Sequence, residues 1–396
     1  MFEKQRSQRE YAALLDIGSG SVTASIVFSD HTANTVEIVW THHERHLLKE
    51  TDPKFGNKPL LTVLLQAILT LGSEGLATLK TYDSRARINR LQISVSAPWS
   101  YTITKSVRIS KDSPFLISKS LLDDVRATAE EKITADIDEN QIARSLELTI
   151  VTRSITELLA NGYQIDQMQQ QEVNSLSLKL SSVIIQDYLH KAIKEARDKV
   201  LPKTKLQIFS TILQLYYVIQ DLHKEMCEYC IISITLEATE IGVVRDGVLT
   251  YSTHESYGIF NLVQEIAQIQ NVPLSEVYAK IQQGALLDNQ SGKVGEAVTD
   301  IFQKYQKKVT ALLQQTGDGF TIPKSVYIHA TGSTENALKP HIELATQRAT
   351  GFVHIVHTVA DEIQIPSASG TADTTIQDVS GYFFHRYGHD ARFSYL

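Results

Sequence analysis

Residues 12–27 read Ala-Ala-Leu-Leu-Asp-Ile-Gly-Ser-Gly-Ser-Val-Thr-Ala-Ser-Ile-Val, so two apolar strands flank a short polar hairpin. Gly18 and Gly20 let the backbone turn tightly and approach an anion, while Ser19 and Ser21 add hydroxyl donors beside the backbone N–H groups. The aspartate that ends the first strand is placed to hold a magnesium ion through water. The pattern predicts a phosphate-binding hairpin, although the same residues also suit an ordinary β-turn.

The bulk composition is that of a soluble globular protein, with 42% hydrophobic and 21% charged residues over a length of 396 that allows two or more domains. A net charge of -7 argues against nucleic acid as a partner, because affinity for phosphate backbones needs clustered Lys and Arg. No stretch approaches about eighteen consecutive apolar residues, and the first six residues lack an apolar signal core. We therefore expect a cytoplasmic protein without direct membrane insertion.

Two residue groups have the spacing of metal or redox sites. Cys227 and Cys230 could form a redox pair or, with His223, part of a zinc site. A second ligand pair is missing and Cys230 leads into an apolar strand, so a small buried side chain is the simpler interpretation. The other group consists of His42, His43 and His46. It indicates a polar loop or, alternatively, a metal site.

The chain repeats its own order of elements. Strands are expected at 11–17, 22–29 and 35–42 and are followed by an apolar-faced helix, and the same order of three strands and helices begins again at 230. Later, an expected strand at 325–329 enters the turn Ala330-Thr331-Gly332-Ser333-Thr334, which opens a helix. The sequence thus predicts two related α/β halves.

This arrangement, the glycine hairpin and the Thr-Gly-Ser turn resemble the actin-like ATPase superfamily, in particular the bacterial FtsA and PilM type. The resemblance implies an α/β fold with duplicated, ribonuclease H-like domains around a nucleotide cleft and an inserted small α+β subdomain. The expected division is 1–85 and 171–228 for the first domain, 86–170 for the inserted subdomain, 229–365 for the second domain with a helical part at about 257–320, and 366–396 for a C-terminal helix returning to the first domain.

The resemblance also implies ATP and Mg²⁺ as ligands. The metal would be held at Asp16, where the first phosphate motif begins. The nucleotide would be bound by the residues that match the first phosphate motif, the adenosine motif and a helix end near the nucleotide, together with one threonine of the second phosphate motif: Asp16, Gly18, Ser19, Gly20, Ser21, Thr239, Lys280, Gly332, Ser333 and Thr334.

The second phosphate motif departs from the family pattern Asp-hydrophobic-Gly-Gly-Gly-Thr-Thr. Ser233 stands where the metal-organising aspartate is expected, and Thr235, Leu236 and Glu237 replace glycines that let the backbone approach the phosphates. Phosphoryl transfer depends on positioning and on neutralising charge. We therefore expect weak ATP binding and no efficient catalysis.

The function implied by the resemblance is a cytoplasmic scaffold that links a membrane assembly, for cell division or type IV pili, to partner proteins through residues 86–170, with self-association possible. Residues 387–396 are too few for the membrane-binding tail of the cell-division type, so the membrane would be reached through a partner. The alternatives are an adaptor that binds no nucleotide and an active small-molecule kinase of the same superfamily.

Overall fold

The first sheet has the strand order β3-β2-β1-β4-β9. Strands β1 (Arg9–Ile17), β2 (Ser21–Asp30) and β3 (Thr35–Arg45) form an antiparallel meander, and β4 (Ile88–Val95) and β9 (Lys205–Ser210) continue the sheet in parallel. The computed structural model describes residues 9–45, 58–139, 146–165, 171–284, 292–316, 322–332, 334–367 and 375–395.

The second sheet repeats this topology, with the order β12-β11-β10-β13-β14. Its meander consists of β10 (Tyr229–Ile234), β11 (Thr239–Arg245) and β12 (Val248–Glu255), and its parallel strands are β13 (Ser325–Ala330) and β14 (Ile355–Thr358). The same strand order with the same directions confirms the duplication expected from the sequence.

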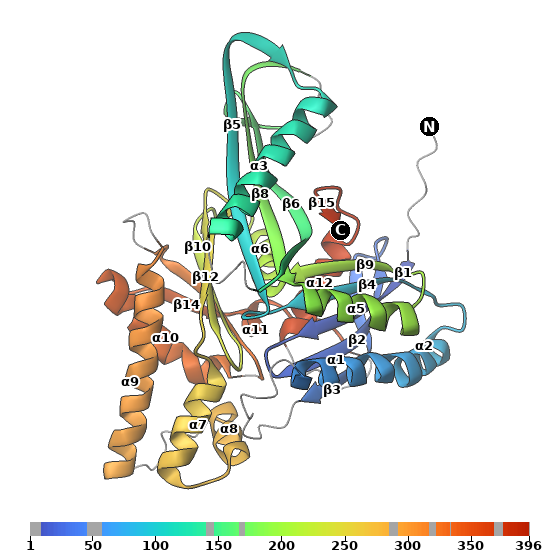
Figure 1. Ribbon diagram of the computed structural model, residues 1–396. Coiled ribbons are helices and arrows are strands. Elements are labelled where there is room, and N and C mark those ends of the chain that lie inside the picture. Colours follow the sequence, from blue (N-terminus) through green and yellow to red (C-terminus); the bar gives the residue numbers. More distant parts are fainter. Residues whose placement is uncertain are drawn as a thin grey trace.

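A third sheet and one helix project from the body formed by the other two sheets (Figure 1). Its order is β15-β6-β8-β5, and α3 (Lys119–Glu139) packs on it through a separate apolar core. The strands are β5 (Ser100–Leu116), β6 (Leu148–Ala160), β8 (Glu172–Gln186) and β15 (Phe393–Tyr395), and the short β7 (Tyr163–Gln164) pairs with β6. We call this unit the module.

The sheets divide the chain at points other than residues 86 and 170. Strand β4 starts at Ile88 but belongs to the first sheet, whereas β8 ends at Gln186 and belongs to the module. The module also takes its edge strand, β15, from the far C-terminal part of the chain. Each expected boundary of the inserted subdomain therefore differs from the boundary in the structure by about the length of one strand.

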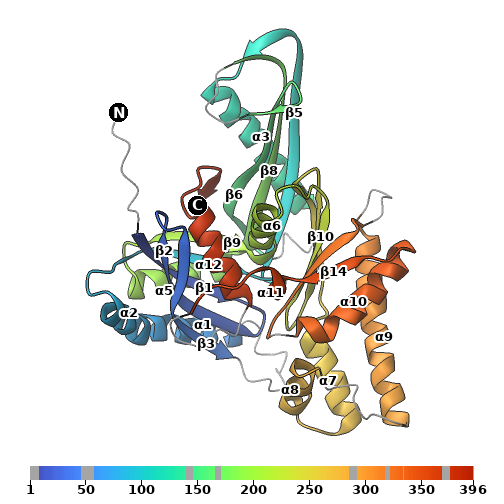
Figure 2. The same cartoon turned by 180° about the vertical axis from the view of Figure 1, so that it is seen from behind.

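Helices cover both faces of the first sheet. One face carries α1 (Lys58–Thr70), the π-helical turn η2 (Leu71–Gly75), α2 (Leu76–Tyr82) and α5 (Asp187–Val200). The other side carries α12 (Thr375–Tyr387) and α6 (Thr211–Leu222), and α6 also contacts β10 and β11, so it lies between the two sheets (Figure 2).

The second sheet has its own set of helices and its own core. They are α7 (Ile259–Gln270), α8 (Leu274–Gln282), α9 (Lys293–Gln314), α10 (Glu335–Thr350) and α11 (Val359–Glu362). Each long helix buries one apolar stripe, as the spacing of its apolar residues requires.

One helical stretch, Leu60–Tyr82, is long and apolar enough to cross a membrane by length and composition. Within the fold, Leu64, Ala67 and Ile68 of this stretch are buried in the core of the first domain. Its buried face packs against β2 and β3, whereas Leu65 and Leu69 on the other face are 46% and 57% exposed.

Candidate functional site

The first phosphate hairpin and its counterpart in the second domain have the same turn. Gly18 N–H donates to Ser21 O at 2.9 Å, and Thr235 N–H donates to Ala238 O at 2.8 Å. Both turns join the first and second strands of their meanders. The structure thus aligns residues 18–21 with residues 235–238.

The register also places Ser233 at the position of Asp16. Each is the penultimate residue of its strand, next to the hairpin, and each lies opposite a residue of both neighbouring strands. Asp16 lies opposite Ser94 on the parallel neighbour, and Ser233 lies opposite His329. In the folded protein, the second domain therefore has a serine hydroxyl at the position where the first domain has the Asp16 carboxylate.

The two hairpins contact each other directly. The side chain of Leu236 packs against Gly20 so closely that a Cβ at Gly20 would lie 2.3 Å from Leu236 Cδ1. In addition, Glu237 N–H donates to Ser19 Oγ at 2.9 Å. These contacts occupy the space between the hairpins, so a phosphate chain that bridges both hairpins does not fit this arrangement.

Asp16 has the features of a cation ligand without lining the cavity described below. Its Oδ1 atom is buried and has no hydrogen-bond partner in the described part of the chain. Burial raises the pKa of Asp16 to about 7, against the opposing effect of a hydrogen bond with Ser94. The carboxylate therefore fits a magnesium ion, whereas the adjoining hairpins do not fit the phosphates that would share it.

A cavity of about 540 Å³ lies beside the hairpins and is bounded by both domains. Its volume is in the range of small-molecule sites. Tyr278 and Gln282 of α8 form one wall, where Gln282 Nε2 donates to Gly332 O at 2.7 Å. Gly332 has φ +72° and a Cβ there would lie 2.1 Å from the Tyr278 hydroxyl oxygen, so this turn requires glycine. The other described lining residues are Gly20, Ser21, His43, Arg45, Leu236, Pro273, Leu274, Ser275, Ala279 and Thr331.

The structure brings some of the residues predicted to bind nucleotide together at this cavity. Gly20, Ser21 and Gly332 line it, and Gly18 and Ser19 lie in the adjoining hairpin. Ser333 lies outside the described residues.

The remaining predicted ligands have other partners. Thr239 Oγ1 donates to Tyr257 O at 2.8 Å, and Thr334 Oγ1 donates to Thr331 O at 3.1 Å. Lys280 Nζ pairs with Glu276 at 2.8 Å along the same helix. None of these three lines the cavity. Their roles as nucleotide ligands stay predictions.

Sequence reasoning missed several residues of the cavity wall. Arg45 ends β3, and Tyr278 and Gln282 lie one helical turn apart on α8. The sequence predicts for His43 a polar loop or a metal site, whereas the structure places it on β3 with its Nδ1 2.8 Å from Thr23 Oγ1. The order of the strands could have predicted the position of Arg45, because the third strand of a meander ends beside the turn that joins the first two strands.

A row of polar residues crosses the second sheet beside the hairpin. His254, Glu240, Ser233 and His329 lie directly opposite one another on four neighbouring strands. Ser233 Oγ and His329 Nδ1 are 3.2 Å apart. Burial raises the pKa of Glu240 to about 8 and lowers the pKa of His329 to about 4. Both side chains are therefore held mainly in their neutral forms at neutral pH.

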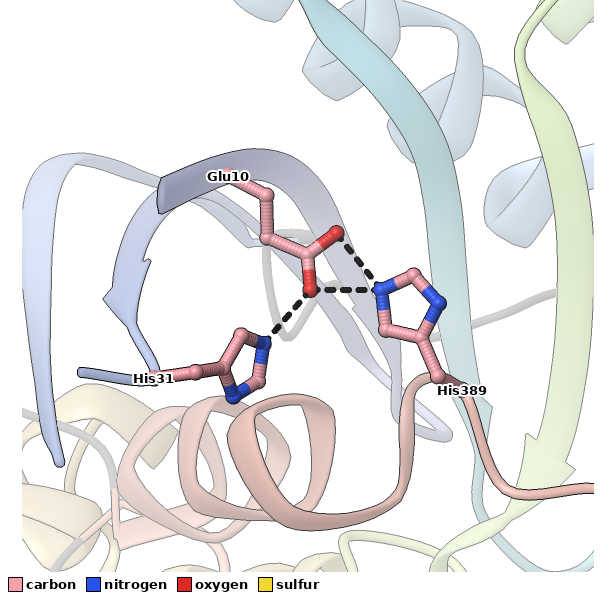
Figure 3. Close-up of side chains that lie close together, drawn as sticks. All are labelled: Glu10, His31 and His389. Carbon is pink, nitrogen blue, oxygen red and sulfur yellow. Dashed lines mark hydrogen bonds and ion pairs between the residues drawn. The ribbon is translucent and has the colours of Figure 1, made fainter. Parts of the chain in front are cut away.

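A second cluster joins the N-terminal strand to the C-terminal segment (Figure 3). Glu10 Oε1 lies 3.0 Å from His31 Nε2 and 2.8 Å from His389 Nε2. Burial acts to raise the pKa of Glu10, but the hydrogen bonds from His389 and His31 outweigh it and hold this pKa below its ordinary value.

The Glu10 cluster has the ligand types of a metal site, with the three ligand atoms within 4.8 Å of one another. Arg90 argues against that use, because its guanidinium lies beside both His389 and Glu10 and its positive charge would repel a metal cation. We therefore assign the cluster to holding the C-terminal segment against β1.

Comparison with known proteins supports the fold. No family model and no curated protein matches the sequence. The structure of the PilM–PilN type IV pilus biogenesis complex matches with a TM-score of 0.55 and 14% identity, covering 94% of this chain and 96% of that chain.

Two other solved structures are less similar. The ethanolamine utilization protein EutJ from Carboxydothermus hydrogenoformans has a TM-score of 0.45 and 10% identity, covering 94% of this chain and 89% of that chain. A Bacteroides thetaiotaomicron protein described as having the actin-like ATPase fold has a TM-score of 0.42 and 10% identity, covering 96% and 98%.

The duplicated sheets and the paired hairpins define an actin-like ATPase fold, which confirms the fold class expected from the sequence. PilM is a particular protein whose structure this chain resembles over nearly its whole length.

Proposed function

We propose that this protein is an actin-like scaffold that links a membrane assembly to partner proteins and does not transfer phosphoryl groups efficiently. The observation that carries this proposal is the direct contact between the two hairpins. Leu236 packs against Gly20, and Glu237 N–H bonds to Ser19, where a triphosphate would have to pass. Protein atoms therefore hold the two domains together at the point where phosphates would bridge them.

The same contact argues against a small-molecule kinase. A kinase must hold the transferred phosphate and its metal ion between groups that neutralise their charge. Here Leu236 takes part of that space, and Ser233 offers no charge at the position equivalent to Asp16. ATP and Mg²⁺ would bind weakly, with the nucleoside in the cavity beside Tyr278 and the ion at Asp16.

The partner proposal rests on the likeness to PilM, which was solved in a complex with PilN. We infer that the module is the docking surface here, at the cytoplasmic face of a membrane. Its tip exposes large apolar side chains, with Tyr163 at 78% and Leu116 at 53% exposure. Exposed side chains of this size at the end of a projecting sheet suit a protein contact.

Calorimetric titration with Mg-ATP tests the hairpin contact. The double variant L236G/E237G removes the leucine and restores two glycines. We expect it to bind Mg-ATP at least ten times more tightly than the unmodified protein, because the phosphate path opens. The control E296G changes an exposed charged residue on α9 that lies outside the cavity wall, and it should not tighten binding. Efficient ATP turnover by the unmodified protein with any small-molecule acceptor would contradict the proposal.

Co-purification tests the scaffold role. The full chain is co-expressed with each membrane protein encoded beside its gene, and the complexes are isolated from detergent extracts. We expect one of them to be retained, and L116S/Y163S to lose it. The control F352S removes an equally exposed apolar side chain, at 66% exposure, from the second domain and should leave binding unchanged. Failure to retain any candidate, or equal loss with F352S, counts against the module as docking surface.

A further inference from the structure

A second, larger cavity of about 800 Å³ lies where the module meets the second domain. Its described walls come from β5, α3, β6 and β8 of the module and from β11 and β12 of the second sheet, which lie side by side in Figure 1. Ser252 Oγ donates to Thr102 O at 2.7 Å across this junction. None of its described lining residues lines the cavity beside the hairpins.

Glu240 is the unusual residue of this cavity. Its side chain lines the cavity, the residue is only 2% exposed, and Oε2 has no hydrogen-bond partner in the described part of the chain. A buried carboxyl oxygen without a partner is unfavourable unless something else satisfies it. The titratable groups that face Glu240 are Tyr101 on β5 and His254 on β12, and burial lowers the pKa of His254, so this ring supplies no permanent positive charge.

The rest of the wall favours a positively charged ligand with an apolar stem. Asp136 and Glu139 add two more carboxylates, of which Asp136 pairs with Lys105. The rings of Tyr101 and His254 lie 5.2 Å apart, and aromatic ring faces attract cations. Apolar side chains complete the wall and suit a methylene chain: Ile103, Ile137, Leu146, Leu148 and Ile184.

We propose that this cavity binds an organic cation, an ammonium or guanidinium group on an apolar stem, with the Glu240 carboxyl group as its partner. The positive charge of the ligand favours the ionised form of this carboxyl group, which is mainly neutral when nothing is bound. The group can come from a Lys or Arg side chain of a partner polypeptide or from a free amine, because both offer the same donors. A ligand there touches the module and the second domain at once. The proposal stands on this cavity alone and does not depend on the scaffold role.

Calorimetry and ligand-observed NMR with the full chain test the proposal. The probes are acetyl-arginine amide, acetyl-lysine amide and spermidine, and the neutral controls of similar shape are acetyl-citrulline amide and acetyl-norleucine amide. We expect the cationic probes to bind and the neutral ones to bind at least tenfold more weakly. Tighter binding of the amino-acid amides points to a polypeptide side chain, and tighter binding of spermidine points to a free amine. Both outcomes support the shared chemistry.

Three variants locate the binding. E240Q keeps the shape of the side chain and should lower the affinity at least tenfold. E296Q, on the exposed face of α9, should not change it. L148W fills the cavity from its half-buried wall and should also abolish binding, which keeps the test valid if E240Q perturbs the fold. No binding of any cationic probe at millimolar concentration, or equal binding by E240Q, overturns the proposal.

Arg144 provides a further control from the chain itself. It lies outside the described residues, in the segment between Glu139 and Leu146. We expect R144Q to bind the probes as the unmodified protein does. If only R144Q binds them, the chain's own arginine is the partner of Glu240 and the proposal fails.

Discussion

Two residues of one polar row respond to pH in opposite directions. His329 is 3% exposed and its burial holds the pKa at about 4, so acid must force a proton onto it in the folded protein. Glu240 is 2% exposed and its burial raises the pKa to about 8, so alkali must remove its proton. Stability should therefore decline on both sides of an intermediate pH.

The alkaline side of this decline can be assigned to Glu240. Between its ordinary pKa of 4.5 and about 8, the folded state holds a proton that the unfolded state has released, so the free energy of unfolding falls as pH rises. We expect E240Q to reduce this fall by about 2–4 kcal/mol between pH 5 and 8.5, since one pKa unit corresponds to about 1.4 kcal/mol. Urea denaturation across this range measures it.

The exposed variant E296Q is the control for the pH experiment, because it removes a carboxylate that is already solvated. Parallel pH profiles for E240Q and the unmodified protein would show that Glu240 ionises in the folded state as easily as in the unfolded state.

At the scale of elements, the long helix of the first domain shows how close packing overrides propensity. Its π-helical turn contains Gly72, where a Cβ would lie 2.4 Å from Val200 Cγ1 on α5. A few residues on, a Cβ at Gly75 would lie 3.0 Å from the Trp40 ring. Both glycines allow the helix to approach its neighbours.

Replacement of Gly72 by alanine tests this close approach. Alanine is the better helix former by about 1 kcal/mol, so propensity alone predicts stabilisation. Because the added methyl group would overlap Val200, we expect G72A to lower the free energy of unfolding by about 1–3 kcal/mol. The neighbouring S73A, on the exposed side, should change it by less than about 0.5 kcal/mol. Stabilisation by G72A in urea denaturation would refute the packing argument.

The sequence predicted elements well where a clear period spans the whole segment. The strands expected at 11–17, 22–29 and 325–329 agree with β1, β2 and β13 to within two residues at each end. It did not predict β15, because three residues in an aromatic and basic tail carry no period and their pairing depends on β6. The π-helical turn was also missed, since Leu71–Gly75 continues the helical pattern of its neighbours.

At the scale of the whole molecule, the C-terminal segment ties the module to the first domain. Helix α12 packs on the first sheet, and β15 then pairs with β6 of the module (Figure 1). Phe393 is 6% exposed, and its ring lies 5.3 Å from that of Phe209 and 5.1 Å from that of Tyr217. The core of the first domain therefore anchors an edge strand of the module.

Truncation of this anchor should loosen the module. We expect F393A to cost about 3–5 kcal/mol of stability, as for other buried Phe-to-Ala changes, and to speed amide hydrogen exchange in β6. The neighbouring S394A is exposed and should leave both unchanged. Hydrogen exchange with mass spectrometry makes the comparison, and unchanged protection of β6 in F393A would contradict the anchoring role.

The candidate site was predictable in part. Residues 18–21 and Gly332 could be found because glycine and small polar residues mark tight turns within one segment. The contact of Leu236 with Gly20 could not be found, because it depends on how the two domains meet. The sequence shows that Leu236 replaces a glycine of the second phosphate motif. Only the structure shows that its side chain packs against Gly20 of the first hairpin.

The pairing of β15 with β6 has a consequence for the order of folding during synthesis. The ribosome synthesises β5, β6 and β8 long before Phe393. Part of the outer edge of β6 therefore stays unpaired until β15 has been made. At usual elongation rates this interval is on the order of tens of seconds. Uncovered strand edges readily pair with other chains. The nascent protein therefore passes through a period in which the edge at Thr152–Ser154 can pair with other chains.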